Sequence, residues 1–146
     1  MEIKKLILNV STSVEAFVDC PNEMKDDERV VLAAVKYSGS SLQYASDRLR
    51  DDLKIVQAAV DEDSDALGYA SERLKNDAKL VLRSVKVWGT SLQYASKELQ
   101  NDKAIVLAAI KARASSIYYA SNELKNNPAF IKAAKKIDED IESYLT

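Results

Sequence analysis

One five-residue stretch recurs along this chain at a fixed interval of 25 residues. It reads LQYAS at 42–46 and 92–96, LGYAS at 67–71 and IYYAS at 117–121, without insertion or deletion between copies. Self-similarity at a fixed period is typical of repeat architectures, in which each unit buries its apolar face against its neighbours. The chain is therefore predicted to be an array of one small unit.

The 25-residue register divides the whole chain. The four regular repeats are 28–52, 53–77, 78–102 and 103–127. Residues 3–27 fit as a divergent first repeat, in which Pro21 falls on the serine position. Because proline lacks an amide donor, the second helix of that repeat is expected to be short or bent.

The chain closes with a partial sixth unit at 128–146, where the register brings polar residues to apolar positions. Lys135 replaces a buried valine and Glu142 replaces a leucine. Terminal repeats are usually atypical because one side faces water. We therefore expect a cap here, and a single helical-repeat domain spanning 1–146.

Each repeat is predicted to contain two short helices. The first, helix A, is about ten residues long and follows a capping residue in each repeat: Asp27, Asp52, Asp77, Asp102 and Asn127. The second, helix B, is expected to start after Ser40, Asp65, Thr90 and Ser115 and, in its first copy, to run to about Arg50. Gly39 and Gly89 mark the joint between the helices.

Apolar residues recur at helical spacing in both predicted helices, as Val30, Val31, Ala34 and Val35 show in helix A. Helices of ten residues are marginal alone, so neighbouring repeats must supply the core. The predicted fold class is all-α: an α-solenoid of about five two-helix repeats plus a capping half-repeat.

The capping aspartate, the VVLAAVK run at 30–36 and LQYAS together resemble the repeat family called domain of unknown function 4116. Close versions of its pattern are LKNDAKLVLRSVKVWGTSLQYAS at 74–96 and LRDDLKIVQAAVDEDSDALGYAS at 49–71. The resemblance covers 24–134 best. The joint glycine is missing at 63–64 and at Ala114, and Gly68 replaces glutamine. The resemblance implies tandem helical repeats, with no assigned activity and no catalytic residues to carry over.

Composition narrows the function further. The chain has a net charge of −2, no histidine and one cysteine, Cys20. Proteins that bind nucleic acid in bulk are usually basic, and structural zinc usually needs Cys and His ligands. Without histidine no Cys–His dyad exists, and no glycine-rich phosphate loop is present. We therefore expect neither an enzyme nor a cofactor or metal site.

A basic face on helix A is the most informative polar feature. Its cations are Arg29, Lys36, Lys54, Lys79, Arg83, Lys86 and Lys111. Asp61 is its one acid, and acidic residues gather elsewhere, so this charge separation favours an acidic peptide or another protein as partner. The alternatives are nucleic-acid or phosphate-ligand binding along the same stripe, or an ordinary solvated face. The sequence leaves open which face of the solenoid is concave.

Several aromatic residues have two interpretations. One tyrosine column comprises Tyr44, Tyr69, Tyr94, Tyr119 and Tyr144. We interpret this column as packing between repeats rather than as an aromatic ladder for a partner. Trp88 and Tyr118 depart from the repeat pattern, and both are candidate partner-binding residues. For Trp88 packing over the joint is the favoured interpretation, and for Tyr118 both remain open.

Length and hydropathy give the remaining expectations. The apolar run Leu6–Val10 is too short for a secretory signal, and no stretch is long enough to span a membrane. The chain is expected to be a complete, cytoplasmic protein without a membrane partner, although a structural module cut from a longer array is a third hypothesis. The sequence does not indicate the oligomeric state, the biological process or the identity of the partner.

Overall fold

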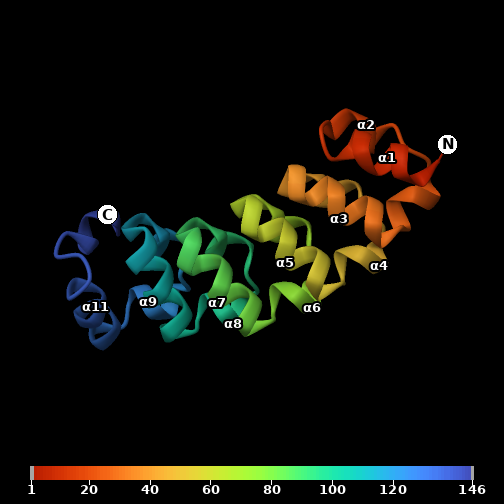
Figure 1. The fold of residues 1–146 in the computed structure, drawn as a ribbon. Helices are drawn as coiled ribbons and strands as arrows, with labels where there is room; N and C mark the ends of the chain where they lie inside the picture. The colour runs from red at the N-terminus through yellow and green to blue at the C-terminus, as the bar shows by residue number, and fades with distance from the viewer. Residues whose placement is uncertain (1, 146) are drawn as a thin grey trace. The chain divides into compact units, whose positions relative to one another are not determined.

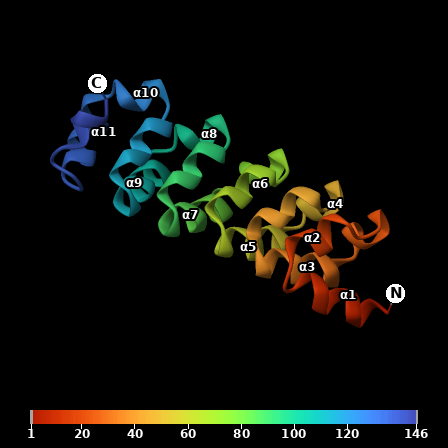
Figure 2. The same cartoon turned by 90° about the horizontal axis from the view of Figure 1, so that it is seen from above.

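The computed structural model describes residues 2–145, which form helices and connecting turns without β-strands (Figure 1). Two compact units divide the chain, Met1–Leu74 and Lys75–Thr146. In each unit, successive helices A pack side by side, as α1, α3 and α5 do in the first unit and α7, α9 and α11 in the second (Figure 2). The all-α solenoid class predicted from the 25-residue period is confirmed. The prediction of a single domain stays a prediction.

The first unit carries the divergent repeat and two regular ones. Its elements are α1 (Ile3–Val10), α2 (Val14–Val18), the 3-10 helix η1 (Asn22–Asp26), α3 (Glu28–Tyr37), η2 (Gly39–Tyr44), α4 (Asp47–Arg50), α5 (Leu53–Glu62), η3 (Ser64–Tyr69) and α6 (Glu72–Lys75), whose last residue belongs to the second unit.

The second unit carries two regular repeats and the partial one. Its elements are α7 (Ala78–Val87), η4 (Gly89–Tyr94), α8 (Lys97–Gln100), α9 (Lys103–Ala112), η5 (Ala114–Tyr119), α10 (Asn122–Lys125), α11 (Pro128–Lys135) and η6 (Ile141–Tyr144).

Helix A forms where its capping residues predict it. In α5, α7 and α9 the aspartate at the N-cap accepts a hydrogen bond from the backbone N–H three residues later, with N···O distances of 3.0, 2.8 and 2.9 Å. Asn127 caps α11 in the same way, and Pro128 occupies the first helical position, where its missing N–H is harmless. These caps satisfy amides that the helix itself leaves without a partner.

The prediction of helix B as one continuous helix is wrong. Each regular repeat instead has a six-residue 3-10 helix, a break, and a four-residue α-helix. The break lies at the alanine and serine of the recurring stretch. Ala45 and Ser46 adopt extended backbone angles, with ψ of 158° and 157°. The continuous helix is lost because the serine makes other hydrogen bonds.

That serine links each repeat to the preceding one. The backbone N–H of Ser46 donates to the carbonyl of Lys25 at 2.9 Å, and its Oγ donates to the Asp26 carboxylate. The same Oγ accepts from the N–H of Leu49, which caps α4. Equivalent bonds join Ser71 to residues 50 and 51, Ser96 to 75 and 76, and Ser121 to 100 and 101. We call this set of bonds the serine clasp.

The side chain that accepts the serine hydrogen bond in each clasp also interacts with the residue two places after the serine. In the first unit the acceptors are Asp26 and Asp51, and Arg48 and Arg73 pair with them at 3.0 and 2.9 Å. In the second unit the acceptors are asparagines, which donate to glutamates: Asn76 to Glu98 at 3.2 Å and Asn101 to Glu123 at 3.0 Å. Both kinds of junction thus join side chains of complementary chemistry: aspartate with arginine, or asparagine with glutamate.

The core lies between helix A and the 3-10 helices. In the regular repeats, helix A contributes Val30, Val31, Ala34 and Val35 and their equivalents, and the 3-10 helices contribute Leu42, Leu67, Leu92 and Ile117, all buried. At the joint, a Cβ on Gly39 would lie 2.3 Å from the Ala59 carbonyl oxygen, and one on Gly89 would lie 2.5 Å from that of Ala109. Glycine is needed there because the following helix A approaches so closely.

The end repeats differ as the sequence predicts. After Pro21 the first repeat has the 3-10 helix η1 where the other repeats have a short α-helix. In the terminal unit, the two polar replacements Lys135 and Glu142 form an ion pair at 2.9 Å. Among residues 2–145 no helix combines the length and the apolar character needed to cross a bilayer.

Candidate functional site

The structure places all the predicted partner-binding residues at the surface, in two separate units. Arg29, Lys36 and Lys54 are exposed in the first unit. The second unit carries the exposed residues Lys79, Arg83, Lys86, Trp88, Lys111 and Tyr118. Tyr118 lies on η5, whereas the four cations lie on α7 and α9, and Trp88 directly follows α7.

In the first unit two of the three cations, Arg29 and Lys54, share one register position. Arg29 and Lys54 are the second residues of α3 and α5, and the equivalent second residue of α1 is Lys4, which is also exposed. Arg29 is held by Asp27, with a guanidinium–carboxylate distance of 2.7 Å. This hydrogen bond raises the pKa of Arg29 and lowers that of Asp27.

The position of these cations is unfavourable for the helices themselves. The positive end of the helix dipole lies at the first turn, where a cation costs about 0.3–1 kcal/mol. Lys54 in α5 and Lys79 in α7 occupy this first turn. A residue type that opposes local helix stability is expected where another role favours it.

In the second unit the cations form a row across neighbouring helices. Lys86 and Lys111 are the ninth residues of α7 and α9, and Lys136 follows the end of α11 at the equivalent position. All three are exposed. Because α9 packs against both α7 and α11, the three lysines come from equivalent positions of neighbouring repeats. We call Lys86, Lys111 and Lys136 the lysine row.

An exposed apolar residue follows each member of the lysine row. Val87 is 60% exposed and Ile137 41% exposed, and Ala112 between them is exposed as well. Trp88, next to Val87, is 40% exposed, so the joint leaves much of its side chain uncovered. Exposed apolar patches rimmed by polar residues are a mark of protein–protein interaction sites.

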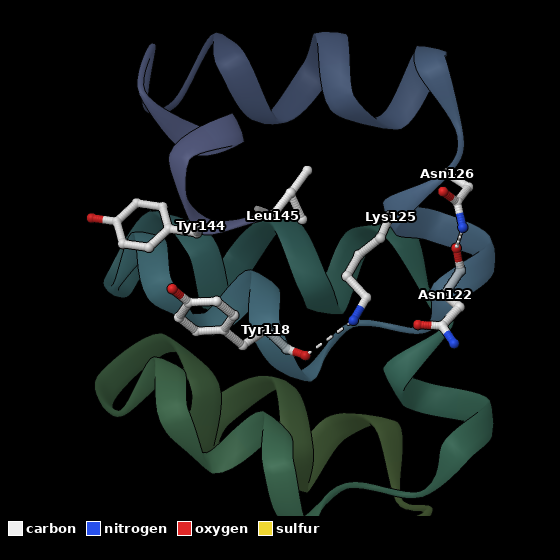
Figure 3. A pocket seen from close by; sticks show the side chains of 6 residues that line it. All are labelled: Tyr118, Asn122, Lys125, Asn126, Tyr144 and Leu145. Carbon is white, nitrogen blue, oxygen red and sulfur yellow. Dashed lines mark hydrogen bonds between the residues drawn. The ribbon is translucent and has the colours of Figure 1, made fainter.

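A second candidate surface surrounds Tyr118. Its ring stacks edge to face on Tyr144, with centroids 5.9 Å apart and an interplanar angle of 86°. The two rings border a hollow of about 370 Å³ that Asn122, Lys125 and Asn126 also line, with Leu145 beside them (Figure 3). Lys125 reaches back to the Tyr118 carbonyl, with an Nζ···O distance of 3.4 Å.

A neighbouring hollow of about 470 Å³ shares Tyr118, Asn122 and Lys125. It extends along η4 and α8 to Gln93 and Lys97. We call the two hollows together the tyrosine groove. Tyr119 of the recurring tyrosine column lines it and is half-buried, as are Tyr44, Tyr69 and Tyr94, which agrees with a packing role at the edge of each repeat.

Cys20 and the acidic side chains are the groups that could supply a thiol nucleophile or metal ligands. Cys20 is buried, and burial raises the pKa of its thiol, which lowers its nucleophilicity at neutral pH. Among residues 2–145 no three Cys, Asp or Glu side chains come together in a way that could hold a metal ion.

The sequence reasoning missed two members of the surface rows, Lys4 and Lys136. Both occur in the divergent end repeats, and only their register position, 25 residues from Arg29 and Lys111, could have identified them. It also missed Lys97, Asn122 and Lys125, which contribute to the tyrosine groove from the short helices α8 and α10.

The model of one family, described as Domain of unknown function (DUF4116), matches five overlapping stretches of the chain. They are residues 6–50, 27–75, 52–100, 77–125 and 102–141. No curated protein and no solved structure is significantly similar to the chain. The matched stretches advance by about one repeat at a time and together span most of the sequence, and the chain therefore belongs to the DUF4116 family.

Proposed function

We propose that this protein is a non-enzymatic binding module that recognises an acidic segment of another protein through the surface of its helices A. The observation that carries the proposal is the lysine row of the second unit with the exposed Val87, Trp88 and Ile137 beside it. Cations in register next to uncovered apolar side chains suit a partner that offers carboxylates and apolar side chains together.

The spacing of the row gives the partner a pattern. Packed helices lie about 8–10 Å apart, so neighbouring lysines of the row are separated by roughly that distance. A segment in the polyproline II conformation advances about 3.1 Å per residue with three residues per turn, which brings every third side chain, on one face, to a new lysine. We therefore propose an extended segment with an acidic residue at every third position and apolar residues between.

The cations in the first turns of the helices support the same proposal. Lys54 and Lys79 lie in the first turns of their helices, where the dipole disfavours a cation, so a role in helix stability does not account for them. By contrast, Lys86 and Lys111 lie in the last turn, where a cation also stabilises the helix by about 0.3–1 kcal/mol. Only a binding experiment separates these two roles of the lysine row.

The experiment measures binding of a fluorescein-labelled peptide that repeats aspartate, leucine and serine, by fluorescence anisotropy at low and moderate salt. The test variant is Lys86→Asp with Lys111→Asp, because Asp61 already occupies the equivalent position in the second regular repeat. We expect this variant to lose most of the binding, and the wild-type affinity to fall as salt rises. A charge reversal of Lys79, Arg83 and Lys86, which lie together on α7, serves as a second variant.

The matched control makes the same change in net charge away from the row. Lys5→Glu with Lys103→Glu alters two exposed lysines in the first turns of α1 and α9, where an acid is favourable. Equal losses in test and control variants, or no salt-dependent binding at all, contradict the proposal. Tighter binding of single-stranded nucleic acid than of the peptide, with a steep salt dependence, would instead favour nucleic-acid binding along the same stripe.

A further inference from the structure

The tyrosine groove differs from the equivalent surface of the other repeats in a consistent way. The residue at the Tyr118 position is Gln43, Gly68 and Gln93 in the other regular repeats. The aromatic ring is thus added in one repeat alone, at a position that is 54% exposed. An added aromatic residue at an exposed site is a common feature of binding hot spots.

The charge of the surface next to Tyr118 also differs from that of the earlier repeats. The first residue of the short helix after the clasp serine is Asp47 and Glu72 in the first two regular repeats. The groove has Lys97 and Asn122 at this position instead. Two acids are therefore replaced by a lysine and a neutral amide, and both of these residues line the hollows.

The lining of the groove is complementary to an anionic peptide. Lys97 and Lys125 contribute the charges, and none of the residues that line either hollow is an aspartate or a glutamate. The amides of Gln93, Asn122 and Asn126 can donate to and accept from a peptide backbone. The Tyr118–Tyr144 corner presents ring surface to an apolar side chain (Figure 3).

We propose that the tyrosine groove is a second docking site, distinct from the lysine row, for an extended acidic segment of a partner protein. A carboxylate of the segment binds between Lys97 and Lys125, and the neighbouring apolar side chain packs against Tyr118. The groove is lined by η4, α8, η5, α10, η6 and the residues next to them, and by no residue of α7 or α9. Its occupation therefore does not depend on the lysine row.

The test is a heteronuclear NMR titration of the full chain with a blocked tetrapeptide of aspartate, phenylalanine, aspartate and leucine. Blocking the termini restricts the anionic groups to the side chains. We expect the largest amide shifts at residues 93–100 and 118–126, and smaller ones at the lysine row. Inorganic phosphate in a parallel titration shows whether a small anion alone produces the same shifts.

Each variant introduces the residue that another repeat has at the equivalent position. Lys97→Glu copies Glu72, and Tyr118→Gln copies Gln93, so both changes suit the fold. Each variant is expected to bind the tetrapeptide about tenfold more weakly than the wild-type chain does. Lys86→Asp with Lys111→Asp is the control, and it should leave tetrapeptide binding unchanged even if it abolishes binding at the lysine row.

The outcomes separate the two proposals. Unchanged tetrapeptide affinity in Lys97→Glu, or shifts that phosphate reproduces in full, would overturn the tyrosine groove as a peptide site. If Tyr118→Gln lowers only the unfolding temperature and leaves binding intact, Tyr118 serves to pack the terminal cap, and the proposal fails. Shifts confined to α7 and α9 would support the lysine row alone.

Discussion

Replacing Ser96 by alanine should lower the free energy of unfolding by about 2 kcal/mol. Ser96 Oγ accepts from the Leu99 N–H at 3.2 Å, and losing this N-cap costs about 1 kcal/mol. The same Oγ donates to the Asn76 side chain of the preceding repeat, a hydrogen bond worth about 1 kcal/mol net. The 2.9 Å bond from the Ser96 backbone N–H to the Lys75 carbonyl survives the change and is left out of the sum.

The assay is urea denaturation followed by circular dichroism, compared at unchanged slope so that the midpoint reports stability. A double-mutant cycle with Asn76→Ala isolates the bond between repeats, and we expect a coupling energy of about 1 kcal/mol. Ser115→Ala is the control, since that serine lies at the start of η5 outside the clasp and should change stability by less than about 0.5 kcal/mol. A loss of less than about 0.5 kcal/mol for Ser96→Ala would refute the serine clasp as a stabilising device.

Three further predictions follow from the core, the joint and the clasp acceptors. Leu92→Ala truncates a fully buried side chain and should cost roughly 2–5 kcal/mol in urea denaturation; a change below about 0.5 kcal/mol would contradict its role in the core. Gly89→Ala should lower the free energy of unfolding by about 1–3 kcal/mol, because the added methyl group would lie 2.5 Å from the Ala109 carbonyl oxygen. Replacing glycine by alanine at an unstrained site instead raises the stability by about 0.4–1 kcal/mol, and such a gain here would refute the close approach. Hydrogen bonds from the clasp serines, and then from Arg48 and Arg73, lower the pKa of Asp26 and Asp51 below the ordinary 3.8. The stabilisation by these two carboxylates is therefore present above pH 3.8 and is lost as the pH falls through the lowered pKa. Asp26→Asn with Asp51→Asn should flatten the acid limb of a plot of unfolding temperature against pH. An unchanged acid limb would contradict this role of the two carboxylates.

The sequence predicted helix A well because its determinants are local. Each capping aspartate lies directly before the apolar run that it caps, and Pro128 supports the last of these caps. Helix B was predicted wrongly because its break depends on a contact between repeats. Ser46 looks like one more residue of a helical stripe until its partners, 20 and 21 residues earlier, are known.

A signal for the clasp is nevertheless present in the sequence. The serine of the recurring stretch always follows an aspartate or asparagine by 20 residues, from Asp26 to Asn101. Aspartate occurs together with an arginine at the 22-residue spacing, as for Arg48, and asparagine with a glutamate, as for Glu123. Matched changes of this kind within one chain indicate a contact.

For the candidate surfaces, the sequence predicted exposure but not grouping. The predicted basic face combined cations from several register positions of helix A, whereas the lysine row takes one register position from three neighbouring repeats and includes Lys136 from the divergent end. The tyrosine groove could not be predicted because Tyr144 reaches Tyr118 only through the packing of η6 on η5. Tertiary contacts of this kind have no counterpart in the repeat pattern.

The most direct measurement is the far-ultraviolet circular dichroism of a peptide that spans one regular repeat, residues 78–102, beside that of the whole chain. Its helices are ten and four residues long, with a six-residue 3-10 helix between them, and each is too short to persist in water alone. The peptide should therefore give the spectrum of an unfolded chain, while the whole protein gives a helical spectrum with a cooperative thermal transition. A monomeric peptide with the same helical signal per residue as the whole chain would contradict the claim that each repeat is held together by its neighbours.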